Sequence, residues 1–537
     1  MGFFLAFRDR PNDRPIPNHK GGQMDTPRRD HPMDRRSFLK KGMHTGALVV
    51  SFPIWKHFAG KDSDSLLAAE AGLPGGLDKD GLRKLLEVCL GRGGEFAEVY
   101  YERTVTNSLS LDEDKITRAT RGLDMGVGFR VLQGEKTGYA FSDDLDFARL
   151  KEAAETAALI ASGAVRQKPA TFTPLSPPSY YLVKVPPDTI ASKDKAALLI
   201  KANAVARAHD KRITQVGVSF YDTNKKIRIA NSEGLHAEDV QTLSWFGVNC
   251  AALEGKQRSM GYESKAGSYG FEHFDLALAE EFGRKAAEMA IRTLPADDAP
   301  AGEFPIVIAA GYGGIFFHEA IGHSLEGDGI RKKTSCFWDK LGQPIASSVV
   351  TLADDGTYKG AWGAVNIDDE GCVGKNTVLI DKGKCAAFIQ DKLNAKLMKV
   401  GQTGNGRRQS YQFYPIPRMT NTYLHAGESK PEDIVKSVDK GLYIAKIGGG
   451  NVSSVTGRFV FSVTEGYMIE GGKIAQPLKG IMLMGSGQEV LKNISMVGDD
   501  LMVIGGGTCG KDGQSKPVGF GNPTLKVDKI TIGGKKA

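Results

Sequence analysis

Residues 304–328 read FPIVIAAGYGGIFFHEAIGHSLEGD, and this stretch carries the strongest structural signals in the chain. Its apolar beginning, Phe304–Ala309, predicts a buried strand. The glycine-rich run Gly311–Gly314 then marks a turn, and it leads into the motif His318-Glu319-Ala320-Ile321-Gly322-His323. The stretch therefore predicts a strand, a tight turn and a short helix that presents two histidines and a glutamate.

The spacing within this motif is unusual. Zinc hydrolases often use H-E-x-x-H on a helix, whereas this chain has H-E-x-x-x-H. On a regular α-helix a five-residue step rotates the chain by about 140°, so His318 and His323 would point apart. A π-like bulge or an early helix break would bring both imidazoles to one side. Gly322 is well placed to ease such a distortion.

The acidic residues around the histidines suggest further roles. We expect the Glu319 carboxylate to face a water molecule held at the metal rather than the metal itself, which suits a general base. Glu326 and Asp328 follow closely and could orient a ligand histidine. Each of these two acids could equally be a solvated loop residue. The alternative for the whole motif is a surface helix that happens to carry two histidines.

A third metal ligand must come from a distant part of the chain. Residues 503–511 place Cys509 in a glycine-rich turn after an apolar strand. A thiolate is a good zinc ligand, and flanking glycines would allow the backbone to approach the metal closely. On spacing alone, however, Cys509 is one of six cysteines, and His425 or His273 remain alternatives. The six cysteines contain no CxxC pair and predict no disulfide framework.

These blocks resemble the TldD/PmbA family of proteases, and the resemblance extends from about residue 75 to the end. Residues 317–328 resemble the metal motif of that family, and Thr508–Lys511 resembles the block that carries its cysteine ligand. Other matching blocks are Ala97–Tyr100, Gly126–Val131, Pro417–Tyr423 and Val463–Tyr467.

The resemblance implies that His318, His323 and Cys509 bind Zn²⁺ and that Glu319 is the catalytic base. Because this chain carries the motif, it is similar to the catalytic TldD-type subunit rather than to the PmbA/TldE-like subunit that lacks it. Family members form dimers, often heterodimers, that enclose a chamber admitting unfolded peptides. The resemblance therefore implies a peptide substrate and either a homodimer or a heterodimer with a PmbA/TldE-like subunit.

The combined expectation is a zinc metallopeptidase that hydrolyses unfolded or small peptides, with Glu319 as general base. Tyr312, Arg418 and His425 are candidate substrate or oxyanion contacts. One alternative is a zinc amidase acting on modified peptides. Another is a non-catalytic peptide-binding subunit with a structural metal. Structural zinc sites usually have four protein ligands, whereas this set has three.

The chain has 537 residues, which favours two or more domains. The best boundary is Pro295–Gly302. We expect an α+β protein: an amino-terminal α/β domain at 72–300, then a β-rich domain at 301–537 with an antiparallel sheet and the short metal-binding helix. Helical spacing is found at 77–91, 147–162, 191–209, 274–293 and 430–439, the last with capping-box spacing from Ser429 to Glu432. Strands are expected at 97–101, 108–111, 125–132, 213–221, 226–230, 459–464 and 467–469.

The first 71 residues have the features of an export signal. Residues 34–41, DRRSFLKK, resemble a twin-arginine signal. The apolar stretch Gly42–Trp55 is too short for a permanent anchor, and Ala69–Ala71 offers small residues for a signal peptidase. We expect a periplasmic or extracellular mature protein, or a cytoplasmic one if the paired arginines arose by chance. No other segment reaches about 18 consecutive apolar residues, so we expect no stable membrane span.

The charge distribution argues against nucleic acid as a partner. The formal net charge is +7, but residues 1–71 contain 12 Lys/Arg and 8 Asp/Glu, so only about +3 belongs to residues 72–537. That body is nearly neutral and has no run of Lys or Arg that would follow a phosphate backbone.

Overall fold

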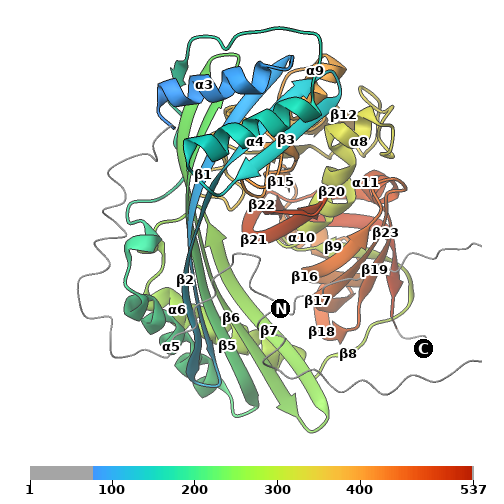
Figure 1. The fold of residues 1–537 in the computed structure, drawn as a ribbon. Helices are drawn as coiled ribbons and strands as arrows, with labels where there is room; N and C mark the ends of the chain where they lie inside the picture. Colours follow the sequence, from blue (N-terminus) through green and yellow to red (C-terminus); the bar gives the residue numbers. More distant parts are fainter. Residues whose placement is uncertain (1–76, 535–537) are drawn as a thin grey trace, which may run out of the picture. The chain divides into compact units, whose positions relative to one another are not determined.

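The computed structural model describes residues 77–534 (Figure 1), which belong to one compact unit, Gly72–Ala537. The predicted signal and leader at 1–71 lie outside the described residues. Within the described part, no helix combines the length and the apolar character needed to cross a membrane.

A seven-stranded sheet forms the amino-terminal half, in the order β3-β2-β1-β5-β6-β4, with β7 pairing with β6. The predicted strands at 97–101 and 108–111 are parts of one long strand, β1, which joins β2 through a tight turn at Glu113 and Asp114. The predicted strands at 213–221 and 226–230 also merge, because β1 and β6 pair with the whole of β5. The strands are β1 (Phe96–Asp112), β2 (Lys115–Gln133), β3 (Lys136–Ser142), β4 (Thr173–Leu175), β5 (Ile213–Asn231), β6 (Leu235–Glu254) and β7 (Gln257–Gly267).

Two pairs of helices pack against this sheet (Figure 1). The first pair, α3 and α4, packs on β1, β2 and β3, and the second pair, α5 and α6, packs on β5, β6 and β7. Capping residues fix several of their starts: the Asp78 carboxylate, for example, accepts a hydrogen bond of 2.7 Å from the N–H of Gly81. All four helices lie where the sequence predicted them. They are α3 (Lys79–Leu90), α4 (Phe147–Ile160), α5 (Ser192–His209) and α6 (Leu276–Thr293), with short 3-10 turns η2 (Pro187–Thr189) and η3 (Phe271–His273).

The carboxy-terminal half is β-rich, as predicted, and contains an eight-stranded sheet in the order β16-β9-β23-β19-β17-β18-β8, with β20 pairing with β23. An additional β16–β17 pairing closes β16, β9, β23, β19 and β17 into a ring. The predicted strands at 459–464 and 467–469 are one strand, β17, which turns into β18 at Gly471 and Gly472. The strands are β8 (Asp297–Asp298), β9 (Gly302–Ile308), β16 (Lys440–Val452), β17 (Arg458–Glu470), β18 (Lys473–Lys479), β19 (Met482–Ser486), β20 (Ile494–Val497) and β23 (Leu525–Gly533).

A six-stranded sheet has the order β12-β11-β10-β15-β22-β21, so β21 is an edge strand. Four of its strands, β10, β11, β12 and β15, lie between β9 and β16 in the sequence. Most strand pairs of these two sheets are antiparallel as expected, but β9–β16, β15–β22 and β8–β18 are parallel. Parallel neighbours need long connections, and here the connections carry whole substructures. The strands are β10 (Leu352–Asp355), β11 (Asn376–Asp381), β12 (Lys384–Cys385), β15 (Asn421–Leu424), β21 (Met502–Lys511) and β22 (Gln514–Asn522), and a separate pair is β13 (Gly406–Arg407) with β14 (Ile416–Pro417).

Short helices connect these strands. The predicted helix near 430–439 is present as α10, but the capping-box prediction is wrong: the N-cap is Lys430, and no side chain caps the first turn. The segments α9 and α11 were not predicted, because seven-residue helices lack a full amphipathic pattern. The helices are α7 (Gly314–Phe316), α8 (Gly327–Arg331), α9 (Lys392–Met398), α10 (Pro431–Lys436) and α11 (Gly487–Asn493).

Buried charges join the amino-terminal sheet to the carboxy-terminal segments. Arg130 on β2 pairs with Glu98 on β1 at 3.2 Å and with Glu370 at 2.7 Å. Arg408 pairs with the other oxygen of Glu98. All four side chains are almost completely buried, so loss of one partner would leave an uncompensated charge and cost about 3–5 kcal/mol.

Candidate metal centre

The H-E-x-x-x-H motif lies on a π-helical turn. After α7 the chain forms the π turn η4 (Phe317–Ile321) and then a 3-10 turn, η5 (Gly322–Leu325). The N–H of Gly322 donates to the carbonyl of Phe317, which is the i→i+5 bond of a π-helix. The widened turn absorbs the extra residue of the motif, so the predicted bulge is confirmed.

Gly322 was expected to ease a backbone distortion, but the structure gives this glycine a different role. Its φ and ψ are −56° and −51°, which any residue can adopt, so its backbone freedom is not needed. Instead, a Cβ atom at this position would lie only 2.0 Å from Sδ of the fully buried Met419. A side chain at this position would displace the end of Met419, because the motif passes directly against this core residue.

The motif is fixed in the largest hydrophobic core of the carboxy-terminal half. Phe317, Ala320, Ile321 and Leu325 are all fully buried members of this core. They alternate with the polar motif residues along the tight turns. Because its neighbours pack in the core, the His318 side chain also lies in the interior and is only 2% exposed.

The structure brings His318, His323 and Cys509 together. One potential ligand atom from each lies within 4.8 Å of the others, and this is the one group of three or more such residues found within residues 77–534. Cys509 Sγ is 3.2 Å from His323 Nε2, although the two residues are 186 positions apart. A tetrahedral zinc ion would separate such sulfur and nitrogen ligands by about 3.6 Å. The separation of Cys509 and His323 is thus close to the one that zinc requires.

The surroundings of His318 also fit a metal ion. Neither of its ring nitrogens has a hydrogen-bond partner in the described structure, although the side chain is buried. Buried polar groups almost always have a partner. Two imidazoles and a thiol suit Zn²⁺, and three protein ligands leave one position open, as in catalytic rather than structural sites.

The cluster is electrostatically prepared for a cation. Burial alone would raise the pKa of the Cys509 thiol, but His318 and His323 outweigh burial and lower this pKa to about 4. For His323, burial opposes protonation, but Glu326 and Cys509 prevail and raise its pKa well above the ordinary value. The cysteine is therefore a thiolate at neutral pH, which is the form that binds metals.

Glu326 and Asp328 lie behind the second histidine. His323 Nδ1 is 3.1 Å from Glu326 Oε2, which fixes the ring with Nε2 toward Cys509. The same oxygen is 3.0 Å from Lys511 Nζ, and Asp328 Oδ1 is 2.7 Å from that ammonium. Burial would raise the pKa of Glu326, but Lys511 and His323 lower it to about 2. Both acids are thus part of the centre rather than solvated loop residues.

Lys511 is a residue of the centre that the sequence reasoning missed. A usable signal existed, because side chains two residues apart on a strand share a face. Lys511 is two residues beyond Cys509, so a strand would present both toward the acids that follow the motif.

Glu319 lies beside the cluster but not in it. Its Oε2 is 3.8 Å from His323 Nε2, and its side chain is 32% exposed, compared with 13% for His323. The carboxylate therefore borders the open side of the metal cluster. This placement is what a general base requires, because it must reach a water molecule and not the metal.

Cys509 is positioned by an irregular edge strand. The β21–β22 register shifts between Ile504 and Gly507, and Gly506 adopts φ +92°, a conformation that favours glycine. Such a bulge changes the direction of the following side chains. Arg418, fully buried, donates 2.6 Å and 3.2 Å hydrogen bonds to the carbonyls of Cys509 and Gln514. Its contacts support the cysteine strand rather than an oxyanion.

The other histidine and tyrosine candidates are placed elsewhere. Tyr312 packs edge-on against Tyr262, at 5.8 Å between ring centroids. His425 stacks on Tyr423 at 5.4 Å, and burial lowers its pKa. His273 contacts Tyr269 in the amino-terminal half, with ring centroids 4.8 Å apart. The structure therefore favours Cys509 over both alternative histidines as the third ligand.

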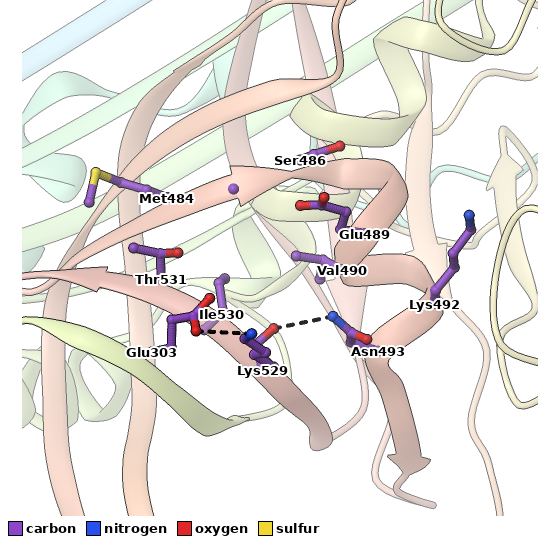
Figure 2. Close-up of a pocket in the computed structure, with 11 residues that line it drawn as sticks. Glu303, Met484, Ser486, Glu489, Val490, Lys492, Asn493, Lys529, Ile530 and Thr531 are labelled. Carbon is purple, nitrogen blue, oxygen red and sulfur yellow. Dashed lines mark hydrogen bonds and ion pairs between the residues drawn. The ribbon is translucent and has the colours of Figure 1, made fainter.

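A surface cavity of about 300 Å³ lies apart from these residues (Figure 2). It is lined by segments of β19, α11 and β23, and Lys529 crosses it to pair with Glu303 at 2.9 Å. No residue of the metal cluster lines it. We assign it no part in the chemistry.

Comparison with known proteins identifies the family. Sequence models of the PmbA/TldA metallopeptidase match in three parts: domain 1 at residues 97–161, the central domain at 185–294 and the C-terminal domain at 301–534. A "Metalloprotease TldD homolog" from Haemophilus influenzae is 39% identical over 471 residues, covering 86% of this chain and 97% of that protein. A "Zinc metalloprotease TldD homolog" from Saccharolobus solfataricus is 26% identical over 449 residues, covering 82% of this chain and 97% of that protein.

The solved structure of TldE from Thermococcus kodakarensis has the same fold. It superimposes with a TM-score of 0.66 at 20% identity, covering 84% of this chain and 99% of that one. The sequence comparisons place the chain among the metallopeptidases. More specifically, it belongs to the PmbA/TldD metallopeptidase family, as its sequence blocks suggested.

Proposed function

We propose that this protein is a zinc-dependent peptidase that hydrolyses unfolded or small peptides. The observation that carries the proposal is the cluster of His318, His323 and Cys509, whose ligand atoms lie within 4.8 Å of one another with Glu319 beside them. The names of the relatives, metalloprotease and in one case zinc metalloprotease, support the same conclusion.

Each residue has a distinct part in this proposal. His318, His323 and Cys509 hold the metal, and Glu326 keeps the His323 ring in the orientation that metal binding needs. Zinc, when bound, lowers the pKa of water and polarises the scissile carbonyl. Glu319 takes the proton from the attacking water and later delivers it to the leaving amine.

Two alternatives predict different results. A structural metal would need a fourth protein ligand, whereas the cluster in the described residues has three members. A zinc amidase would use the same centre and would differ only in its substrate. The proposal is therefore tested through both metal binding and peptide cleavage.

The decisive experiment compares the wild type with Glu319→Gln, and with Glu489→Gln as a control. Glu489 is an exposed glutamate on α11 of the same half of the chain. Cleavage of an unstructured peptide library should require zinc and stop with a chelator. Glu319→Gln should retain zinc and lose about 100- to 10,000-fold in rate, the usual contribution of a general base. Wild-type cleavage by this variant would disprove the base assignment. A zinc-loaded wild type that cleaves only modified amides would favour the amidase.

We also infer that the chain works as a dimer, either with itself or with a TldE-like subunit. The similarity of its fold to a solved TldE supports a shared architecture for the two kinds of subunit. Light scattering of the purified chain, alone and after co-expression with a TldE-like protein, measures the assembly. A monomer under both conditions would contradict this inference.

Export by the twin-arginine route remains part of the proposal. It is supported by the arginine pair Arg35-Arg36, the apolar stretch and the small residues that follow. A periplasmic or extracellular location would expose the enzyme to peptides outside the cytoplasm.

A further inference from the structure

The ammonium group of Lys511 is fully engaged by three partners. Its Nζ is 3.0 Å from Glu326 Oε2, 2.7 Å from Asp328 Oδ1 and 3.2 Å from the carbonyl oxygen of Pro417. An ammonium has three N–H donors, so all of them are used. The Lys511 side chain is only 16% exposed, and its acidic partners are 3% and 15% exposed. This arrangement is a built contact and not a surface ion pair.

These contacts close a ring through the metal cluster. From Cys509 the strand continues to Lys511, whose ammonium binds Glu326. Glu326 binds His323 at 3.1 Å, and His323 Nε2 returns to the Cys509 thiol at 3.2 Å. The ring therefore joins the histidine turn to a strand 186 residues away without using the metal.

A second support reaches the same strand from β14. Lys511 binds the carbonyl of Pro417, and the next residue, Arg418, binds the carbonyl of Cys509. The end of β21 is thus held from two sides. Such support matters because β21 is an edge strand, paired only with β22.

We propose that Lys511 is a positioning residue that preassembles the metal centre by tying the Cys509 strand to the loop after the histidine motif. This inference rests on the proposed function and adds to it the part that holds the remote ligand in place. The hydrogen bonds and ion pairs of Lys511 go to Glu326, Asp328 and the Pro417 carbonyl, so it acts on the ligands through these groups.

Charge alone would give Lys511 the opposite effect. A positive charge near a cation site repels the cation, so neutralising Lys511 would strengthen zinc binding if charge were its main contribution. If positioning dominates, neutralisation must weaken zinc binding, because the ligand strand is released and Glu326 is left without its cation. The sign of the change separates the two roles.

The test measures zinc affinity of the full-length mature chain by competition with a chelator. Lys511→Met should bind zinc about 10- to 100-fold more weakly, which is typical when residues supporting metal ligands are lost. Lys511→Arg, which keeps the charge and the donors, should recover most of this loss. Lys446→Met is the matched control. Lys446 also contacts one carboxylate and one carbonyl, and it is 14% exposed, but neither partner belongs to the centre.

Cobalt(II) provides a readout that general destabilisation would not produce. The charge-transfer band between thiolate and cobalt reports on Cys509 as a ligand. It should be weaker in Lys511→Met at saturating cobalt, and close to wild type in Lys511→Arg and Lys446→Met. If Lys511→Met fails to fold, Asp328→Ala tests the same tie, because it removes one anchor and leaves the Lys511–Glu326 pair. The cobalt band is the readout for this variant, because loss of a negative charge would weaken zinc binding by itself.

The outcomes are distinct. Unchanged or tighter zinc binding by Lys511→Met, or an unchanged cobalt band in Asp328→Ala where that variant replaces it, overturns the positioning role and leaves the proposed function intact. A wild-type chain that binds no zinc overturns the proposed function, and this inference with it. Weaker zinc binding that arginine restores, with a normal Lys446→Met control, supports the proposal.

Discussion

Replacing Gly322 with alanine tests why the motif contains this glycine. The new Cβ would lie 2.0 Å from Met419 Sδ and 3.3 Å from Met419 Cε. An ordinary contact between such atoms is about 3.5–4.0 Å, so either the end of the Met419 side chain must move by about 1.5–2 Å or the two segments must separate by that amount. Met419 is fully buried and cannot turn toward solvent. We therefore expect a loss near the upper end of the overpacking range, about 2–3 kcal/mol of unfolding free energy.

The assay is urea unfolding of the metal-free protein, combined with a double-mutant cycle. Met419→Ala alone should cost about 2–5 kcal/mol, because it leaves a cavity in the core. In that background Gly322→Ala should be nearly neutral, since its methyl group enters the space that methionine left. The coupling energy between the two sites should be about 2 kcal/mol.

Gly510→Ala is the matched control for this substitution. Gly510 directly follows Cys509, yet a Cβ there would meet no atom within 4 Å. We expect a change within about 0.5 kcal/mol, as for ordinary surface substitutions. The reasoning is refuted if Gly322→Ala is equally harmless, or if Met419→Ala does not relieve its cost.

Three further predictions concern the thiol, its support and the leader. Thiolate absorbance of the metal-free protein, with a Cys509→Ala reference subtracted, should titrate with a midpoint near pH 4. Because folding lowers this pKa, the contribution of Cys509 to stability is complete above its unfolded pKa and is lost as the pH falls through 4. A midpoint near pH 9 would contradict this prediction. Arg418→Met removes the guanidinium that donates to the buried carbonyls of Cys509 and Gln514. Urea unfolding should show a loss of about 2–4 kcal/mol in unfolding free energy. A loss under about 1 kcal/mol would show that these hydrogen bonds contribute little. Replacing Arg35 and Arg36 with lysine should keep the protein in the cytoplasm on fractionation, and continued export would refute the signal.

Local patterns were sufficient to predict much of the secondary structure. The helix α3 has apolar residues at helical spacing and a capping aspartate, and both signals lie within its own sequence. Strand length was harder to predict. The polar segment between 221 and 226 interrupts the apolar alternation of β5, yet neighbouring strands pair with it on both sides. Tertiary hydrogen bonding thus extends a strand where local propensity would end it.

The metal centre was predictable to a different extent for each residue. The spacing of His318 and His323 demanded a π-like turn, since a regular helix would separate them. Cys509 could be selected among six cysteines only through the resemblance to a family. Lys511 and the role of Met419 depend on contacts between segments about 90 to 190 residues apart, which no local pattern encodes.

The separation of the ligands has a consequence for the metal-free state. In small zinc domains the metal supplies the folding energy, and the chain unfolds without it. Here the cysteine strand is also held by Lys511 and Arg418 through four hydrogen bonds or ion pairs to protein atoms. The metal-free protein should therefore stay folded, with zinc adding stability by mass action, about 4 kcal/mol at a thousandfold excess over Kd. Because β21 is an edge strand, hydrogen exchange should show that gain most strongly around Cys509.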